Sequence, residues 1–464
     1  MRPVTAFFAG EDRYADLSAE AAAEHLSRAI QCRTVNFADH SLTDFREFDA
    51  LQELMKKSFP AVMKAGSFEC IGHAVLITIP GTDESLLPCL YMSHQDVVPV
   101  VAGTEQDWTY DAFSGAIEDG YIWGRGTLDI KEMVCGILEA TEYLLRSGRA
   151  FRRTAYLAFG DDEETLNLGA LSIAQELKRR GVRLEFVLDE GGGKLEDGAI
   201  FGAPGRCISL IDMMEKGYAD LQLSVKSAGG HSSRPWGGTS LGRLAKAIAA
   251  VADHPFPVRL PKAMAAMFEV LAPLITEEPL RTLVQDVQGN AEKIASWCAG
   301  RAETFAYVTT TIAPTMIEGG SAACNVLPQN MQAAINFRLS EGETADSLMA
   351  HCRRVIDDEQ VELRFLQAND PSATARSDGF GYRALTEALG EFFSEVTFVP
   401  AMTAGATDAR RYECICDTCL RCSPFVAESE DIRRGVHGTD ERISIRSYLQ
   451  GIRVLIRLME IANL

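Results

Sequence analysis

Strand-like and helix-like segments alternate along most of the chain, and this alternation constrains the fold more than any other feature of the sequence. Hydrophobic periodicity predicts strands at 74–79, 89–92, 154–159 and 184–188, and helices at 21–30, 131–146, 170–180 and 444–461. Such an order favours an α/β fold, because each helix can cover the sheet formed by the strands on either side of it. We expect a mixed, largely parallel sheet flanked by helices.

The middle of the chain follows a different order. Its patterns predict strands at 218–226, 306–312, 331–339 and 361–366, a helix that begins at Thr239 or Ser240, and a second helix at 346–356. The order strand–helix–strand–strand–helix–strand is that of a split βαβ sandwich. We therefore expect one α/β domain made of residues 1–212 and 373–464, interrupted by an inserted α+β domain at 213–372.

Charge and composition exclude several classes of protein. The 65 acidic and 45 basic residues give a formal net charge of −20, and such a field repels the phosphate backbone of nucleic acids. No apolar run reaches the length of about 18 residues that a membrane-spanning helix needs. The first ten residues lack the apolar stretch of a signal peptide, and the 12 cysteines of so long a chain do not indicate a disulfide scaffold. We expect a soluble cytoplasmic protein that binds neither nucleic acid nor membrane.

Ionisable residues follow the predicted strands at the points where these strands end. His94 and Asp96 follow the second strand, the acidic run 161–164 follows the third, the pair 189–190 follows the fourth, and Asp129 precedes a helix. Because the carboxyl ends of parallel strands meet at one edge, we expect these groups on a single rim. So many carboxylates repel one another unless a cation neutralises them. Imidazole and carboxylate ligands suit zinc, and two ions bridged by one carboxylate are a known hydrolytic arrangement.

Each of these groups by itself has a simpler explanation. The acidic run 161–164 suits the N-terminus of a helix, Asp129 can cap the helix that follows it, and the pair 189–190 fits a turn. Their joint placement after successive strands is what favours a metal site. Asp96, two residues after His94, is spaced to accept a hydrogen bond from the second ring nitrogen of that histidine.

Eight motifs in order along nearly the whole chain resemble one family, the cocatalytic zinc metallopeptidases. This family includes aminoacylase, carboxypeptidase S, carnosinase-like dipeptidases and succinyl-diaminopimelate desuccinylase; Asp189-Glu190-Gly191-Gly192 and the lead-in Glu215-Lys216-Gly217 look closest to the carboxypeptidase S branch. The motifs are Ser93-His94-Gln95-Asp96-Val97-Val98-Pro99, Trp123-Gly124-Arg125-Gly126-Thr127-Leu128-Asp129-Ile130-Lys131, Asp162-Glu163-Glu164, Asp189-Glu190-Gly191-Gly192, Gly230-His231-Ser232-Ser233, Asn325-Val326-Leu327-Pro328, Thr407-Asp408-Ala409-Arg410 and His437-Gly438-Thr439-Asp440-Glu441.

The resemblance implies two zinc ions per subunit, with Co²⁺ or Mn²⁺ as substitutes. The implied ligands are His94 and Asp189 for one ion, Glu164 and His437 for the other, and Asp129 bridging both. The residues alone do not separate Asp189 from Glu190 as the ligand, and we expect Asp189 because it ends the strand directly. The resemblance also implies a cis peptide bond between Asp129 and Ile130.

The resemblance assigns further roles around the metals. Glu163 would be the general base, and the inserted domain would be a lid that also forms a homodimer. His231 would reach the site of the partner subunit and stabilise the oxyanion, Asn325 would help to bind substrate across the dimer, and Arg410 would pair with a substrate carboxylate. Without the resemblance, a histidine in a flexible glycine loop is the simpler interpretation of His231. For Arg410, a surface ion pair and a substrate role are equally good interpretations.

These implications predict hydrolysis of an amide bond by metal-activated water, with Glu163 carrying the proton to the leaving amine. The leading expectation is a peptidase of the carboxypeptidase or dipeptidase type acting on a small peptide. An enzyme that removes the acyl or succinyl group from an N-acyl amino acid is the alternative. A non-catalytic relative that binds metal or peptide is disfavoured, because every expected ligand and the base are present.

Other patterns add less. The sequence has no nucleotide-binding glycine loop, no His-Glu-x-x-His and no Gly-x-Ser-x-Gly, which removes support for nucleotide sites, single-zinc helical proteases and serine hydrolases. Four cysteines lie close together at Cys414, Cys416, Cys419 and Cys422. A structural zinc or iron–sulfur site is one interpretation, but the spacing is not a standard one, so we expect mainly buried thiols.

Overall fold

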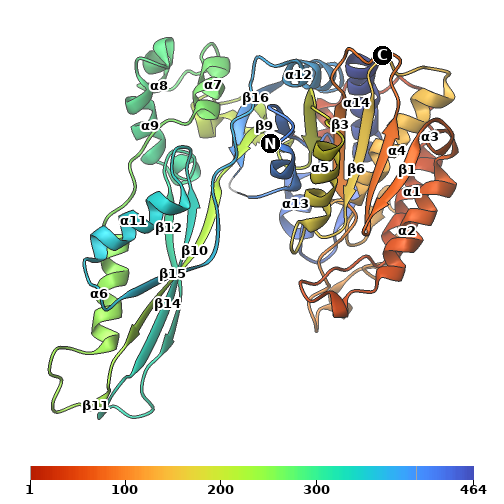
Figure 1. Ribbon diagram of the computed structural model, residues 1–464. Helices are drawn as coiled ribbons and strands as arrows, with labels where there is room; N and C mark the ends of the chain where they lie inside the picture. The colour runs from red at the N-terminus through yellow and green to blue at the C-terminus, as the bar shows by residue number, and fades with distance from the viewer. Residues whose placement is uncertain (1, 404) are drawn as a thin grey trace.

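The computed structural model describes residues 2–403 and 405–464. Figure 1 shows a broad lobe that contains both chain ends and a narrow lobe that projects from it. The broad lobe is built on a nine-stranded sheet. Its strands, in spatial order, are β1 (Ser67–Ile71), β2 (Ala74–Ile79), β6 (Ala155–Gly160), β3 (Cys89–His94), β7 (Phe186–Asp189), β17 (Cys419–Arg421), β9 (Cys207–Glu215) and β16 (Val396–Thr403), and β8 (Leu195–Asp197) pairs with β9.

The pairing within this sheet is mixed, as predicted. β3 runs parallel to both β6 and β7, β17 is parallel to β7, and β16 is parallel to β9. Antiparallel pairs join β1 to β2 and β2 to β6. The three strands at the centre therefore end at the same edge of the sheet, which is where the site is expected.

Helices bury both faces of the sheet, because successive residues of a strand point to opposite sides. In β2, Val75 and Ile77 belong to one hydrophobic core, whereas Ala74 and Leu76 belong to another. The second core is closed by α5 (Leu168–Arg179). In the broad lobe, the helices that bury residues in the first core are α1 (Ala19–Gln31), α2 (Phe45–Ser58), α3 (Pro60–Ala65), α4 (Lys131–Arg146), α12 (Phe380–Phe392) and α14 (Ile445–Asn463).

The narrow lobe has the predicted order of a split βαβ sandwich. Its sheet is antiparallel throughout, and its own core contains Leu221, Leu244, Phe337 and Leu348. The strands in spatial order are β12 (Thr311–Gly319), β14 (Asn330–Leu339), β10 (Gly217–Lys226) and β15 (Glu362–Asn369), covered by α6 (Ser240–Ala252) and α11 (Ala345–Ile356). At its far end lies a short ladder of β11 (Gly230–His231) and β13 (Val326–Leu327) (Figure 1).

One predicted strand is misplaced. The sequence pattern favours a strand at 306–312, but β12 begins only at Thr311. The backbone oxygens of Ala306 and Thr309 accept hydrogen bonds from the ammonium group of Lys216, at 2.8 and 2.6 Å. These carbonyls satisfy a buried lysine instead of a neighbouring strand, so the ladder starts later than the apolar pattern indicates.

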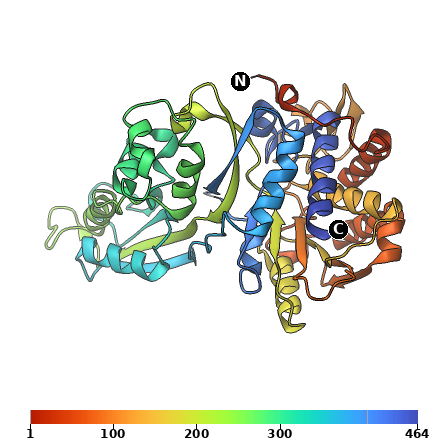
Figure 2. The same ribbon diagram turned by 90° about the horizontal axis from the view of Figure 1, so that it is seen from above.

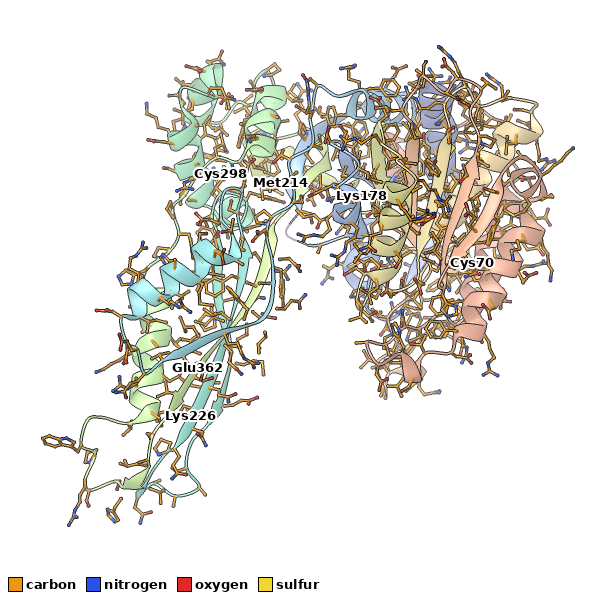
Figure 3. All side chains as sticks on the ribbon, viewed as in Figure 1. Cys70, Lys178, Met214, Lys226, Cys298 and Glu362 are labelled. Atoms are coloured by element: carbon orange, nitrogen blue, oxygen red, sulfur yellow. The ribbon has the colours of Figure 1, made fainter. Side chains whose placement is uncertain are left out.

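The interval 213–372 contributes to both cores. Its helices are α7 (Lys262–Leu271), α8 (Leu280–Leu283), α9 (Ala291–Ala299) and α10 (Ala302–Phe305). Met264 and Phe268 of α7 and Cys298 of α9 lie in the large core, and α7 packs against β16 and β9. In the view from above, these green helices lie on the side of the narrow lobe, beside the strands that connect it to the broad lobe (Figure 2). Met214 and Cys298 lie near the junction (Figure 3). Within the described residues, no helix is both long and apolar enough to cross a lipid bilayer.

Candidate metal centre

The candidate site lies where the central parallel strands end. β3 ends at His94, β6 ends just before the acidic run 161–164, and Glu190 follows the last residue of β7. Asp129 is the second-last residue before α4. His437 lies in the segment between α13 (Ser429–Gly435) and β18 (Arg442–Ser444). β18 belongs to a small antiparallel sheet, in which it pairs with β5 (Tyr121–Trp123) and β5 pairs with β4 (Ile117–Glu118).

His94 presents one ring nitrogen to two carboxylates. Its side chain is 1% exposed, and Nδ1 donates a hydrogen bond of 2.9 Å to the backbone oxygen of Asp96. Nε2 lies 3.3 Å from a carboxylate oxygen of Asp129 and 3.3 Å from one of Glu190. Nε2 is buried and has no hydrogen-bond partner among the described residues. In the neutral ring this nitrogen carries a lone pair that faces two anions, an arrangement that a cation between them would stabilise.

A second group shares Asp129 with the first. Nε2 of His437 lies 3.0 Å from the other carboxylate oxygen of Asp129 and 3.0 Å from Glu164. The side chain of His437 is 52% exposed. The two groups, His94–Asp129–Glu190 and Asp129–Glu164–His437, each have their potential ligand atoms within 4.8 Å of one another. The peptide bond between Asp129 and Ile130 is cis, as the resemblance implied.

The acid beside His94 is Glu190, and the expected placement of Asp189 there is corrected. Asp189 is buried, and its carboxylate accepts hydrogen bonds from the backbone N–H groups of Glu190 at 2.8 Å and Ala409 at 2.7 Å. Side chains alternate along a strand, so the last residue of β7 turns towards Ala409 while the next residue points to the rim. Burial raises the pKa of Glu190 to about 7, against the lowering effect of His94.

Asp96 fixes both the histidine and the acidic run. Its carboxylate oxygens accept hydrogen bonds from the backbone N–H groups of Glu163 and Glu164, each at 3.1 Å, and one oxygen lies 3.4 Å from Nδ1 of His94. Asp96 therefore aligns two segments of the rim at once. The carboxylate of Glu163 lies close to the ring of His94 and the carboxylate of Glu164. These three residues form a third compact group of potential ligands. Burial and the charge of Glu190 raise the pKa of Glu163 well above its ordinary value.

A buried ion pair that the sequence analysis did not assign a role joins the two loops of the second group. Arg125 donates to Glu441 at 2.6 Å and to the backbone oxygen of Gly438 at 2.8 Å. The other oxygen of Glu441 accepts from the backbone N–H groups of Gly126 at 3.0 Å and Leu128 at 2.8 Å. The pair thus ties the loop before Asp129 to the loop that carries His437. Arg125 and Glu441 belong to two of the motifs that carry the resemblance. Their opposite charges were the signal in the sequence that could have predicted this ion pair.

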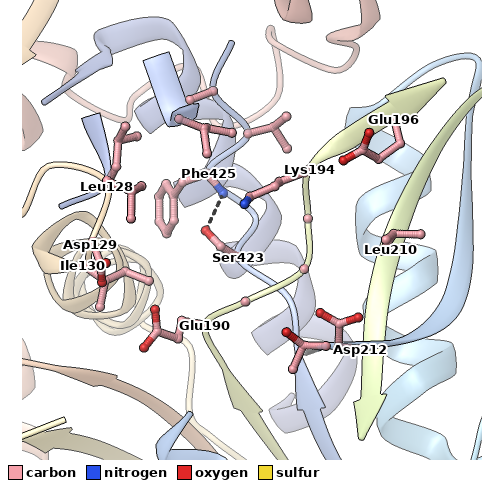
Figure 4. A pocket seen from close by; sticks show the side chains of 18 of the residues that line it. Leu128, Asp129, Ile130, Glu190, Lys194, Glu196, Leu210, Asp212, Ser423 and Phe425 are labelled. Atoms are coloured by element: carbon pink, nitrogen blue, oxygen red, sulfur yellow. Dashed lines mark hydrogen bonds between the residues drawn. The ribbon is translucent and has the colours of Figure 1, made fainter. Parts of the chain in front are cut away.

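A cavity of about 450 Å³ opens beside this centre, with Asp129 and Glu190 in its wall. Figure 4 shows these two acids on one side of the cavity and Lys194, Glu196 and Asp212 on the other. Much of the remaining wall is apolar. The apolar side chains in the wall are Leu128, Ile130, Leu210, Ala306, Tyr307, Met402, Phe425, Val426, Ala427, Ile432 and Val436.

Residues 90–461 match Peptidase family M20/M25/M40. The chain belongs to this family. It is 34% identical over 445 residues to the N-fatty-acyl-amino acid synthase/hydrolase PM20D1.1 of Danio rerio, and the matched region covers 93% of this chain and 84% of that protein. It is 27% identical over 489 residues to carboxypeptidase S of Saccharomyces cerevisiae, covering 92% and 82% respectively.

The fold of this M20 protein is also found in solved structures of the family. The M20 metallo-carboxypeptidase Sso-CP2 of Sulfolobus solfataricus superimposes with a TM-score of 0.66 at 17% identity, covering 96% of this chain and 98% of the other. Human carnosine dipeptidase 1 gives a TM-score of 0.63 at 15% identity, with 97% and 98% covered. Family membership establishes the chain as a metal-dependent peptidase or amidohydrolase.

Two predicted residues lie away from the centre of this M20 chain. His231 on β11 is exposed at the far end of the narrow lobe, and its Nδ1 contacts the hydroxyl of Ser233 at 2.8 Å. Asn325 is exposed at the same end, where its backbone oxygen accepts from Ser232 at 2.9 Å. Figure 1 shows this end separate from the broad lobe that carries the candidate metal ligands.

Arg410 already has partners within the chain. Its guanidinium donates to the backbone oxygen of Asp370 at 2.6 Å and lies 3.7 Å from the buried carboxylate of Glu215. Glu215 in turn accepts from the buried Arg421 at 2.6 Å. Arg410 is not part of the cavity wall described above. These contacts are those of an ion pair with the buried Glu215, and the substrate role of Arg410 stays a prediction.

The cysteine cluster forms no recognisable metal site. Cys416, Cys419 and Cys422 are buried, and Cys414 is exposed. In the part of the chain that the structure describes, no group of three potential metal ligands contains any of the four. Cys416 and Cys419 pack in the core behind α5, and Cys422 packs in the large core.

Proposed function

We propose that this M20 protein is a dinuclear hydrolase that cuts amide bonds of small peptides, with two Zn²⁺ ions held at the rim. The observation that carries the proposal is the shared position of Asp129, which belongs to both three-residue groups. A carboxylate with one oxygen near each histidine is the arrangement that two neighbouring ions require.

The residues present fit two such ions. His94, Asp129 and Glu190 would hold one, and Asp129, Glu164 and His437 the other. The donor set of imidazole and carboxylate suits Zn²⁺, with Co²⁺ or Mn²⁺ as substitutes. Support comes from the buried Nε2 of His94, which has no hydrogen-bond partner among residues 2–403 and 405–464. Two bound divalent ions supply a Lewis acid for the amide carbonyl and lower the pKa of water towards neutrality.

Glu163 is the proposed general base. Its backbone N–H is held by Asp96, and its carboxylate belongs to the compact group with His94 and Glu164. Burial raises the pKa of Glu163, which makes it a better proton acceptor than an exposed carboxylate. Glu163 takes a proton from the attacking water at its carboxylate and delivers that proton to the nitrogen of the leaving amine.

A second candidate is hydrolysis of N-acyl amino acids. It is favoured by the similarity to a relative named N-fatty-acyl-amino acid synthase/hydrolase, which is 34% identical to this chain. Both candidates cut an amide and share a free carboxylate on the leaving amino acid. A homodimer in which His231 and Asn325 complete the partner's site, and a cytoplasmic location, are further parts of the proposal.

A metal-restoration assay tests the proposed function. The protein is stripped with a chelator, reloaded with Zn²⁺, Co²⁺ or Mn²⁺, and assayed on matched dipeptides, C-terminally extended peptides and N-acyl amino acids. We expect no turnover in the stripped protein and restored turnover on at least one amide class. Equal activity with and without metal, or no cleavage of any amide by the fully loaded protein, would contradict the proposal.

A further inference from the structure

We propose that Lys194 binds the free carboxylate of the substrate, and that the cavity beside the metal centre takes the leaving amino acid with an apolar side chain. This inference rests on the proposed function and adds a specificity residue and a substrate class to it. Neither the motifs nor the resemblance assign a role to Lys194, which comes two residues after the motif Asp189-Glu190-Gly191-Gly192.

Lys194 is the positive charge of the cavity. The other ionisable side chains in the wall, Asp129, Glu132, Glu190, Glu196, Asp212 and Glu303, are all acidic. Among the residues that the structure describes, none forms an ion pair with the ammonium group of Lys194 within 4.0 Å. Figure 4 shows this side chain directed across the cavity towards Phe425. With Asp129 and Glu190 engaged by the proposed metal ions, the remaining acids of the wall repel a substrate carboxylate, and Lys194 is the side chain of the wall that attracts it.

The loop before Lys194 is built to hold it there. Gly191, Gly192 and Gly193 all have positive φ, at 94°, 44° and 70°. A Cβ on Gly193 would lie 2.0 Å from the backbone oxygen of Ser423, and one on Gly192 would lie 2.6 Å from that of Leu210. The backbone N–H of Gly193 donates to Leu210 at 2.8 Å. Only glycine fits this close approach, and the tight path returns the chain to the cavity at Lys194.

The rival cation is less suited to the task. Arg410 donates to Asp370, lies beside the buried Glu215, and is absent from the wall of the cavity. Binding a substrate there would require those contacts to break and leave the buried carboxylate of Glu215 with one cation fewer. Lys194 is an exposed residue, and it acts on Glu196 and Asp212 only through the field of its charge, which opposes the rise that burial causes in their pKa values. Binding a substrate at Lys194 therefore breaks no ion pair of the kind that Arg410 makes with Glu215.

The apolar wall indicates the side chain that accompanies the carboxylate. Leu128, Ile130 and Phe425 line the cavity between the acids of the metal centre and Lys194 (Figure 4). A volume of about 450 Å³ is within the range of small-molecule sites and holds one large amino acid. Burying a Leu or Phe side chain against this wall is favourable, whereas the carboxylates of the wall would repel an acidic side chain. The leaving amino acid is therefore apolar.

The test compares a free acid with its amide. The best substrate of the panel that ends in Leu or Phe is prepared as the free acid and as the C-terminal carboxamide, and both are assayed with the metal-loaded wild type and K194M. We expect the wild type to prefer the acid. K194M should raise KM for the acid about 10- to 100-fold, leave kcat and the carboxamide nearly unchanged, and retain wild-type metal content. K194R should restore the preference.

A binding measurement and two further variants complete the design. Calorimetry of the same acid with E163Q and with the E163Q/K194M double variant reports affinity without turnover, and we expect a similar 10- to 100-fold loss. K226M is the matched control, since Lys226 is an exposed lysine of the narrow lobe (Figure 3), and it should leave the preference intact. The inference is overturned if K194M affects acid and carboxamide alike, if it affects neither, or if R410M removes the preference instead. Failure of the proposed function is distinct, because the wild type would then cleave nothing.

Discussion

The rim of the nine-stranded sheet and the tip of the narrow lobe both carry residues predicted for the site, but the chain holds them very differently. At the rim, the side chain of His94 is 1% exposed, and its Nδ1 donates to the backbone oxygen of Asp96. Its Nε2 lies 3.3 Å from a carboxylate oxygen of Asp129. At the tip, His231 and Asn325 are exposed on a two-residue ladder. The comparison teaches that one chain can bring its candidate metal ligands together while holding its proposed oxyanion donor away from them.

This difference follows from where each group sits. Carboxyl ends of adjacent parallel strands converge, so β6, β3 and β7 bring their residues together without any other element. The narrow lobe has a separate core and reaches away from the rim (Figure 1). A second copy of the chain is the proposed means of bringing the two regions together, and the following predictions break or sharpen that contrast.

The largest effect is expected at the rim. E163Q removes the proton acceptor but keeps nearly the same shape, so kcat should fall about 10²- to 10⁴-fold while metal content stays at the wild-type level. Steady-state kinetics on the best amide substrate, together with elemental analysis, measure both quantities. Full turnover in E163Q, or loss of metal from it, would show that Glu163 is not the base.

The tip is tested by complementation. H231A should lower kcat, and mixing unfolded H231A and E163Q chains before refolding should recover about a quarter of wild-type activity, because half of the dimers are mixed and each has one intact site. Neither variant refolded by itself should reach that level. A mixture that stays at the background of the separate variants would mean that His231 does not act across a dimer.

An intermediate effect is expected where the rim depends on loops. R125K keeps a positive charge but loses the fork that contacts Glu441 and Gly438, so the loop carrying His437 should loosen. Affinity for one of the two metal ions should fall about 10- to 100-fold, with the other less affected. Competition with a chelator measures this, and R152K, at an exposed pair with Asp83, is the control. Identical metal affinity in R125K and the wild type would contradict the role of the ion pair.

The smallest effect is expected at the cysteine cluster. C416S should leave metal content and kcat unchanged, because the described residues place no three-ligand group at these cysteines. Elemental analysis and the standard assay are sufficient. Loss of one metal ion per chain in C416S would show that the cysteines bind a metal ion, and would contradict the account that the rim holds all of the metal.

The sequence predicts the layers of the fold well, because periodicity reports burial. α4 (Lys131–Arg146) and β2 (Ala74–Ile79) have the predicted bounds, and the split order of the narrow lobe is as expected. The strand predicted at 306–312 fails because Lys216 takes the carbonyls of that segment, a contact between residues distant in sequence.

The candidate site shows the same limit at finer scale. Residue types and order identify the rim, but whether Asp189 or Glu190 faces His94 depends on which side of the sheet the last residue of β7 points to. The sequence does not predict Lys194 as the cation of the cavity, for a related reason. Lys194 owes its place to the positive φ angles of three preceding glycines, and composition and spacing do not reveal where such a turn leads.

Counting metal ions tests the central claim most directly. Elemental analysis of the wild type after equilibration with Zn²⁺ and removal of free metal should give two ions per chain. H437A should retain one, whereas D129A should lose tight binding of both, because Asp129 belongs to both ligand groups. A wild-type chain that holds a single ion, or a D129A chain that still holds two, would contradict the account.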